Sequence, residues 1–189
     1  MKKILVITTG GTIDAEPYEE TPIDVTPLKE TMIPKALDIL GLSEQCAMHK
    51  FCMKDSKDIS QSDLEHIASI IEQNTQNYDG FLITHGTDTM PENGRALKTL
   101  LNIEKPVALV GAMEPLLNGK SATSPEDINN ATSDGWKNLH YAATHIMVQD
   151  AGVYVAAQEQ MMPVDNLAKN FDLKQFYIAG HSGGGYKAR

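Results

Sequence analysis

Two short segments place hydroxyl side chains beside glycine, each directly after an apolar run. The first, residues 8–14, reads TTGGTID, and the second, residues 84–90, reads THGTDTM. Glycine lets the backbone approach a ligand closely and lets consecutive N–H groups point in one direction. A hydroxyl beside such N–H groups favours either an anion-binding loop or a nucleophile with its oxyanion hole.

Other interpretations of these segments stay open at this point. Both segments could be plain strand-to-helix turns, with Thr89 as the N-cap of a following helix. Nucleotide binding is disfavoured, because neither segment contains Gly-Lys-Ser/Thr and the first segment lacks the third glycine of the dinucleotide fingerprint. Two hydroxyl-rich segments after neighbouring strands favour chemistry over turns.

A threonine hydroxyl attacks only after a base has taken its proton. His85 stands beside the second segment, but a histidine at the end of a buried strand is expected to pack or hydrogen-bond within the fold. Tyrosine or lysine is therefore the base to seek, and Tyr18 follows Thr12 in a segment, residues 15–22, that is rich in turn formers. We expect this segment to act as a lid.

A parallel sheet would bring the two threonine segments together. Apolar runs predict strands at residues 4–9, 46–53, 80–84, 106–110 and 152–157. Apolar periodicity and capping residues predict helices over residues 27–40, from Ser60 onward, over 89–101 and over 124–143.

The strands are apolar without alternation, which indicates burial on both faces. The pattern therefore predicts an α/β fold, doubly wound and Rossmann- or flavodoxin-like, with a mostly parallel sheet and helices on both faces. In such folds the ligand binds at the carboxyl ends of the strands.

The length and charge of the chain limit its class. Its 189 residues suit one domain, which we expect over residues 1–178, with the glycine-rich residues 179–189 as a flexible tail. A net charge of −9 disfavours nucleic-acid partners. No apolar run reaches the roughly 18 residues of a membrane helix. We expect neither a nucleic acid nor a membrane as partner.

The cysteines and histidines predict no metal site or other cofactor. Cys46 and Cys52 would lie about 20 Å apart on a strand, beyond disulfide reach. Two reduced thiols fit a cytoplasmic protein. The six histidines show no Cys/His pair at zinc spacing and no His-Glu-x-x-His.

Five segments, in order, resemble the bacterial-type L-asparaginase/glutaminase family. Residues 8–13 and 83–90 resemble its two signature segments, and residues 105–113 (KPVALVGAM) look like the segment that follows them. Residues 55–58 (DSKD) and 165–170 (DNLAKN) are weaker matches to its substrate-binding serine loop and to the stretch that bears its catalytic lysine. Common members carry a second, smaller domain after this region, so the chain resembles a short, single-domain branch.

The resemblance implies a catalytic role for matching residues. Thr12 would attack the side-chain amide carbonyl, giving an acyl-enzyme and ammonia, with Tyr18 as its proton acceptor. Thr87, Asp88 and Lys169 would form a second group of hydroxyl, acid and amine, in which an ammonium lowers the cost of forming an alkoxide. Without the resemblance, Lys169 would be taken for an ordinary surface lysine.

Substrate-binding roles follow in the same way. The backbone N–H groups of Gly11 and Thr87 are candidate oxyanion donors. Ser56 and Asp88 would hold the α-carboxylate and α-ammonium of the substrate, beside Gly86. Lys57 stands where many family members have a glutamine that contacts substrate, so we expect recognition of the amino group to differ.

The resemblance implies an amidohydrolase that converts L-asparagine to L-aspartate and ammonia. Two alternatives stay open: a non-catalytic amino-acid-binding module, and an amidase for glutamine or another small amide. One methylene separates asparagine from glutamine and is worth only about 1–3 kcal/mol in a pocket. An open site would be poorly shielded from water, so we expect a homodimer or higher homo-oligomer.

Overall fold

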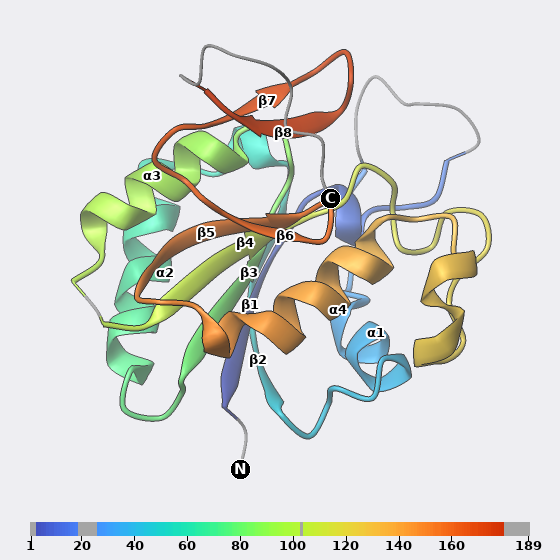
Figure 1. The fold of residues 1–189 in the computed structure, drawn as a ribbon, viewed down its shortest axis with the longest axis horizontal. Coiled ribbons are helices and arrows are strands. Elements are labelled where there is room, and N and C mark those ends of the chain that lie inside the picture. The colour runs from blue at the N-terminus through green and yellow to red at the C-terminus, as the bar shows by residue number, and fades with distance from the viewer. Residues whose placement is uncertain (1–2, 19–25, 103, 180–189) are drawn as a thin grey trace.

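The computed structural model describes residues 3–18, 26–102 and 104–179. Six strands form one sheet in the order β2-β1-β3-β4-β5-β6 (Figure 1). The parallel strands are β1 (Ile4–Gly10), β2 (Cys46–Lys54), β3 (Gly80–Thr84), β4 (Pro106–Val110) and β5 (Gly152–Ala157), and β6 (Gln160–Pro163) runs antiparallel to β5. The doubly wound, mostly parallel sheet predicted from the sequence is confirmed.

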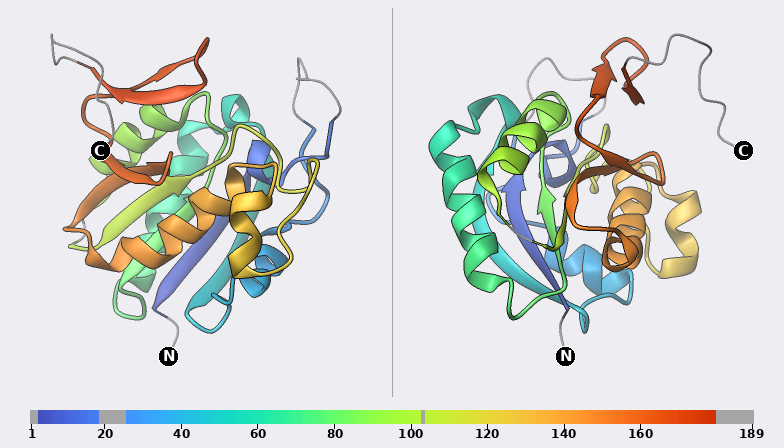
Figure 2. Two further views of the ribbon diagram at one scale, coloured as in Figure 1. Left: turned by 45° about the vertical axis from the view of Figure 1, so that its right-hand side comes forward. Right: turned by 60° about the vertical axis from the view of Figure 1, so that its left-hand side comes forward.

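Helices cover both faces of the sheet. α1 (Ile33–Ile39) and α4 (Gly135–His145) lie on one face, and α2 (Gln61–Asn74) and α3 (Met90–Leu100) lie on the other (Figure 2). Successive side chains of a strand point to opposite faces. In β1 this places Ile4 and Val6 in the core under α1 and α4, and Leu5 and Ile7 in the core under α2 and α3.

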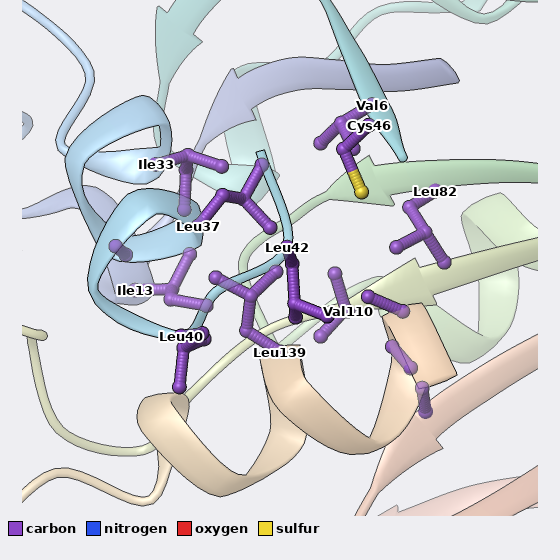
Figure 3. Close-up of a cluster of buried hydrophobic side chains, with 14 of the residues drawn as sticks. Val6, Ile13, Ile33, Leu37, Leu40, Leu42, Cys46, Leu82, Val110 and Leu139 are labelled. Atoms are coloured by element: carbon purple, nitrogen blue, oxygen red, sulfur yellow. The ribbon is translucent and has the colours of Figure 1, made fainter. Parts of the chain in front are cut away.

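The core under α1 and α4 also anchors the segment that follows β1. Thr12–Asp14 form one short 3-10 turn there. Ile13, which is fully buried, packs in the same cluster as Leu37 of α1 and Leu139 of α4 (Figure 3). Burial of Ile13 fixes this turn, while the neighbouring Thr12 stays partly exposed at the end of the sheet.

The helix expected over residues 27–40 is confined to α1. Pro27 instead forms an antiparallel bridge with Ala15, and the helix begins only at Ile33. The buried Asp14 carboxylate then accepts a hydrogen bond of 2.6 Å from the Met32 N–H at the start of α1. Contacts with a segment far away in sequence thus override the local helical pattern.

The prediction of one continuous helix over residues 124–143 is also wrong. Pro125–Asn130 form a 3-10 helix, and α4 starts only after a break. At the break, the Thr132 N–H donates to the Lys120 carbonyl and the Lys120 N–H donates to Thr132 Oγ1, both at 2.8 Å. These two bonds fold the chain back on itself in place of a continuous helix.

The last described residues form a two-stranded antiparallel sheet of β7 (Leu167–Asn170) and β8 (Gln175–Ile178), which the sequence did not predict (Figure 1). The Arg95 guanidinium of α3 donates to the carbonyls of Leu167 (2.8 Å) and Val164 (3.2 Å). These bonds fix β7 against α3. The expected tail, except residue 179, lies outside the described residues.

The described part of the chain holds no helix long and apolar enough to cross a membrane. In the same ranges, no group of three or more histidine, cysteine, aspartate or glutamate side chains is placed to hold a metal ion.

Candidate active site

The site is built at the point where the winding of the sheet reverses. β1 lies between β2 and β3, so the chain leaves β1 toward one edge and later returns on its other side. Ligands of doubly wound sheets bind at the carboxyl ends of the strands at such a switch point. Here the two threonine segments, which follow β1 and β3, stand next to each other.

Three of the segments singled out in the sequence lie in close contact at two glycines. A Cβ atom built on Gly11 would lie 2.3 Å from the Gly86 nitrogen, and one built on Gly86 would lie 2.6 Å from the Ser56 Cβ. Gly11 also has a φ of +80°, which disfavours other residues. The glycines therefore permit a close approach that brings Thr12, Ser56 and the segment after β3 to one place.

Thr9 and Thr84 of these segments are structural. Thr9 Oγ1 donates to the Thr84 carbonyl at 2.5 Å, and the Thr9 N–H donates to Thr84 Oγ1 at 3.2 Å. Both side chains are buried. They tie the end of β1 to the end of β3, while Thr12 and Thr89 are partly exposed.

Lys169 joins the segment after β3 from the distant strand β7. Its Nζ donates to Thr87 Oγ1 at 2.7 Å and to Asp88 Oδ1 at 2.6 Å. The Lys169 side chain is only 6% exposed. An ammonium buried to this degree is held by charge-assisted hydrogen bonds, so the hydroxyl, the carboxylate and the amine form one fixed group.

Asp88 is ionised and engaged on both oxygens. Partial burial raises the pKa of its carboxyl, but the ammonium groups of Lys169 and then Lys57 outweigh burial and hold the pKa below its ordinary value. Lys57 Nζ lies 3.3 Å from Asp88 Oδ2, the oxygen that Lys169 does not take.

Thr12 is partly exposed at the first position of its 3-10 turn, beside Gly11. The expectation that the Gly11 N–H serves as an oxyanion donor does not fit the structure, because this N–H donates to the Lys54 carbonyl at 2.9 Å. The cause is the parallel pairing of β1 with β2, which continues to Gly10 and Lys54 after an irregularity in register.

Tyr18 lies at the side of the site formed by the segment after β4. Its hydroxyl donates to the Met113 carbonyl at 3.1 Å, and its N–H donates to Asn118 Oδ1 at 3.1 Å. Burial, followed by the charges of Glu114 and Asp134, raises the pKa of the phenol. In this arrangement Tyr18 is a protonated donor. Residues 19–22 of the expected lid lie outside the described residues.

Asp134, which the sequence did not single out, holds the segment that receives Tyr18. Its carboxylate accepts from the N–H groups of Met113 (2.9 Å) and Glu114 (3.1 Å) and from the Asn138 amide (3.0 Å). Burial raises the pKa of this carboxyl. Asp134 lies far along the chain from Met113 and Glu114, so no local spacing reveals these two contacts.

His85 and Asn93 form hydrogen bonds that hold the segment after β3. His85 is fully buried, and its Nδ1 lies 2.7 Å from the Gly86 carbonyl. Its Nε2 lies 3.0 Å from the Asn93 amide nitrogen. An amide nitrogen only donates, so Nε2 accepts and Nδ1–H donates to Gly86. Burial lowers the pKa of His85, which keeps it neutral.

Comparison with known proteins identifies the family of this chain. Residues 3–173 match the family model of the asparaginase N-terminal domain. L-asparaginase 1 of Escherichia coli K12 is 35% identical over 127 residues, which cover 64% of this chain and 36% of that protein. A probable periplasmic L-asparaginase of Haemophilus influenzae is 32% identical over 69% of this chain and 38% of its own length.

Solved structures of L-asparaginases share the fold of this chain. L-asparaginase I from Vibrio cholerae superposes with a TM-score of 0.74 at 26% identity, over 94% of this chain and 52% of its own. The L-asparaginase from Thermococcus kodakarensis gives a TM-score of 0.70 at 28% identity, over 88% and 47%. This chain thus spans between about a third and about half of the length of each of these four proteins. It belongs to the asparaginase family, whose N-terminal domain accounts for residues 3–173.

Proposed function

We propose that this protein is an amidohydrolase that converts L-asparagine to L-aspartate and ammonia through an acyl-threonine. The observation that carries the proposal is the Lys169 ammonium, buried and bonded to both Thr87 and Asp88 at the switch point of the sheet. A fixed amine beside two threonine segments is suited to proton transfer at a hydroxyl.

In the proposed reaction Thr12 Oγ bonds to the amide carbonyl carbon and loses its proton to a base. The tetrahedral intermediate expels ammonia after the amide nitrogen gains a proton. Water, deprotonated in turn, then attacks the acyl-threonine and releases the carboxylic acid. The base is Tyr18 or the Thr87–Lys169 pair. Because the Tyr18 hydroxyl donates to the Met113 carbonyl, Tyr18 must leave that bond to act as the base.

The oxyanion is proposed to be stabilised by the N–H of Thr87, because the N–H of Gly11 already donates to the Lys54 carbonyl. Ser56, which is buried under Gly86, is proposed to hold the substrate carboxylate. Asp88 is proposed to hold the α-ammonium of the substrate, beside Lys57.

A non-catalytic binding module remains a second candidate. The observation in its favour is Tyr18, whose raised pKa and bond to Met113 oppose a role as base at neutral pH. A binding module would retain affinity for small amino acids or their amides without releasing ammonia.

Ammonia release from L-asparagine and L-glutamine tests the proposal on the full chain. Thr12→Ala should abolish release, while Thr99→Ala, an exposed hydroxyl on α3, should leave it unchanged. A Thr12→Ala protein with undiminished release would rule out the proposed nucleophile. Calorimetric binding of the amide by a wild-type protein without turnover would favour the binding module.

We further propose a homo-oligomer located in the cytoplasm, with residues 1–178 as one domain. In support, neither cysteine of the described chain forms a disulfide, as expected in a reducing compartment. Analytical ultracentrifugation of the purified protein and fractionation of cells test these two proposals. A monomer at working concentrations would contradict the first, and recovery outside the cytoplasm would contradict the second.

A further inference from the structure

Arg95 of α3 holds the strand that carries Lys169. That strand, β7, pairs only with β8 in the described part of the chain and lies outside the six-stranded sheet. The register of the main sheet therefore does not place Lys169. Arg95 Nη1 donates to the Leu167 carbonyl at 2.8 Å and to the Val164 carbonyl at 3.2 Å. Leu167 lies two positions before Lys169, on the same face of β7.

The helix that carries Arg95 also follows the partners of Lys169. α3 starts at Met90, directly after the segment that holds Thr87 and Asp88. A helical backbone is held by its own hydrogen bonds and has a fixed rise per residue. Arg95 therefore ties the amine of the site to the same helix that positions its hydroxyl and its carboxylate.

Apolar packing brings the start of β7 to α3 but does not fix its position there. A Cβ built on Gly94 would lie 2.7 Å from Val164 Cγ1, so the two segments are in close contact. Val164 and Leu167 are buried in the same cluster as Met90 of α3. Burial of apolar surface is non-directional, whereas a hydrogen bond requires a defined distance and angle. The two bonds from Arg95 thus specify where the carbonyls lie along the helix.

Lys98, one turn further along α3, contacts the same region in a different way. Its Nζ pairs with the side chain of Asp165 at 2.6 Å, and about half of each side chain is exposed. An exposed ion pair of this kind contributes little to position or stability. Arg95 differs because its two acceptors belong to the backbone.

We infer that Arg95 is a positioning residue for Lys169. By fixing the start of β7 on α3, it keeps the Lys169 ammonium 2.7 Å from Thr87 Oγ1 and 2.6 Å from Asp88 Oδ1. The inference rests on the proposed amidohydrolase function and adds a residue that acts through Lys169. A displacement of about 1 Å in a catalytic group can cost about 10²-fold in rate.

Titration of the Asp88 carboxyl tests this geometry without turnover. Partial burial raises the pKa of Asp88, but the ammonium groups of Lys169 and then Lys57 hold it below its ordinary value. Arg95→Met keeps much of the apolar stem and removes the donors. It should raise the pKa of Asp88, followed by NMR spectroscopy, because Lys169 is no longer held on Oδ1.

Arg95→Lys is the conservative variant. Both bonds come from Nη1, so a single ammonium can replace them in part, although the lysine side chain is shorter. The pKa of Asp88 should therefore rise less than in Arg95→Met.

Ammonia release from L-asparagine then tests the effect on the reaction. Arg95→Met should lower kcat by about 10²-fold and change KM far less, because Lys169 is proposed to act in the chemical step. Arg95→Lys should recover part of the lost kcat. Lys98→Met is the matched control on the same helix and should keep both the wild-type kcat and the wild-type pKa of Asp88.

The outcomes separate this inference from the proposed function. If Arg95→Met and Arg95→Lys keep the wild-type pKa of Asp88, the inference is wrong, whatever their kcat, and the proposed function stands. An equal effect of Lys98→Met would also contradict it. If the wild type releases no ammonia from any amide, the proposed function is wrong and the titration of Asp88 alone decides the role of Arg95.

Circular dichroism establishes that each variant is folded. If Arg95→Met does not fold, Arg95→Lys decides the question: a raised pKa of Asp88 supports the inference, and an unchanged one overturns it.

Discussion

Gly11 rests directly against Gly86, so that a Cβ on Gly11 would lie 2.3 Å from the Gly86 nitrogen. The contact joins the two threonine segments where β1 and β3 end. It fixes the separation between Thr12 on one side and Thr87 with Asp88 on the other. A site built from two loops therefore has the rigidity of the sheet beneath it.

Gly11→Ala should destabilise the fold and abolish activity. The added Cβ meets backbone atoms that cannot move aside, and the φ of +80° is unfavourable for alanine. We expect a loss of about 2–4 kcal/mol in the free energy of unfolding, measured by urea denaturation. Gly41→Ala is the matched control, because Gly41 has a φ of +70° but an added Cβ would meet only Pro125 Cγ, at an ordinary contact distance of 4.0 Å. It should cost only about 1–2 kcal/mol. Equal losses in the two variants would show that the contact with Gly86 is not the cause.

Lys169→Met should remove the amine of the site and lower kcat by about 10²–10⁴-fold. Methionine retains much of the apolar length of the buried side chain, while Thr87 and Asp88 lose their shared donor. Ammonia release under saturating substrate measures the effect. Lys98→Met deletes an exposed lysine paired with Asp165 at 2.6 Å and should retain wild-type kcat. A Lys169→Met protein of normal kcat would contradict the role proposed for this residue.

Stability should fall as the pH drops below about 6.5, because of His85. Burial lowers its pKa in the folded protein, so the unfolded chain binds a proton that the fold excludes. The stabilising contribution is complete above the unfolded pKa and is lost as the pH falls toward the folded pKa. The slope contributed by this one proton is at most about 1.4 kcal/mol per pH unit.

Urea denaturation between pH 5 and pH 7, a range set around the histidine pKa of about 6.5, tests this expectation. His85→Gln should flatten the dependence of the unfolding free energy on pH. His49→Gln removes an exposed histidine and should leave the dependence as in wild type. If both variants keep the same slope, the pH dependence arises from other groups.

The parallel sheet could be predicted because its signal is local. Unbroken apolar runs such as residues 4–7 must be buried on both faces, and the following glycine and hydroxyl residues mark strand ends. The helices were less predictable. α1 and α4 are shorter than their apolar periodicity suggests, since Asp14 and Lys120 supply hydrogen-bond partners from other parts of the chain.

Some residues of the candidate site could likewise be predicted from the sequence, and some of its contacts could not. Thr12, Thr87 and Asp88 stand out in the sequence because each lies in a glycine-rich segment, and a resemblance of motifs adds Lys169. Nothing in the local sequence indicates Asp134, or the bond from His85 to Gly86, or the engagement of the Gly11 N–H by Lys54.

The sequence by itself determined the sheet, the family and the residue types available for chemistry, because apolar runs and short motifs are properties of neighbouring residues. Only the tertiary structure decided which charges meet. Lys57 and Lys169 are far apart in the chain, and the two converge on Asp88 because β7 and the turn after β2 both lie against the segment that follows β3. Coulomb interactions depend on distance in space, so the pairing of both ammonium groups with Asp88 follows from the fold.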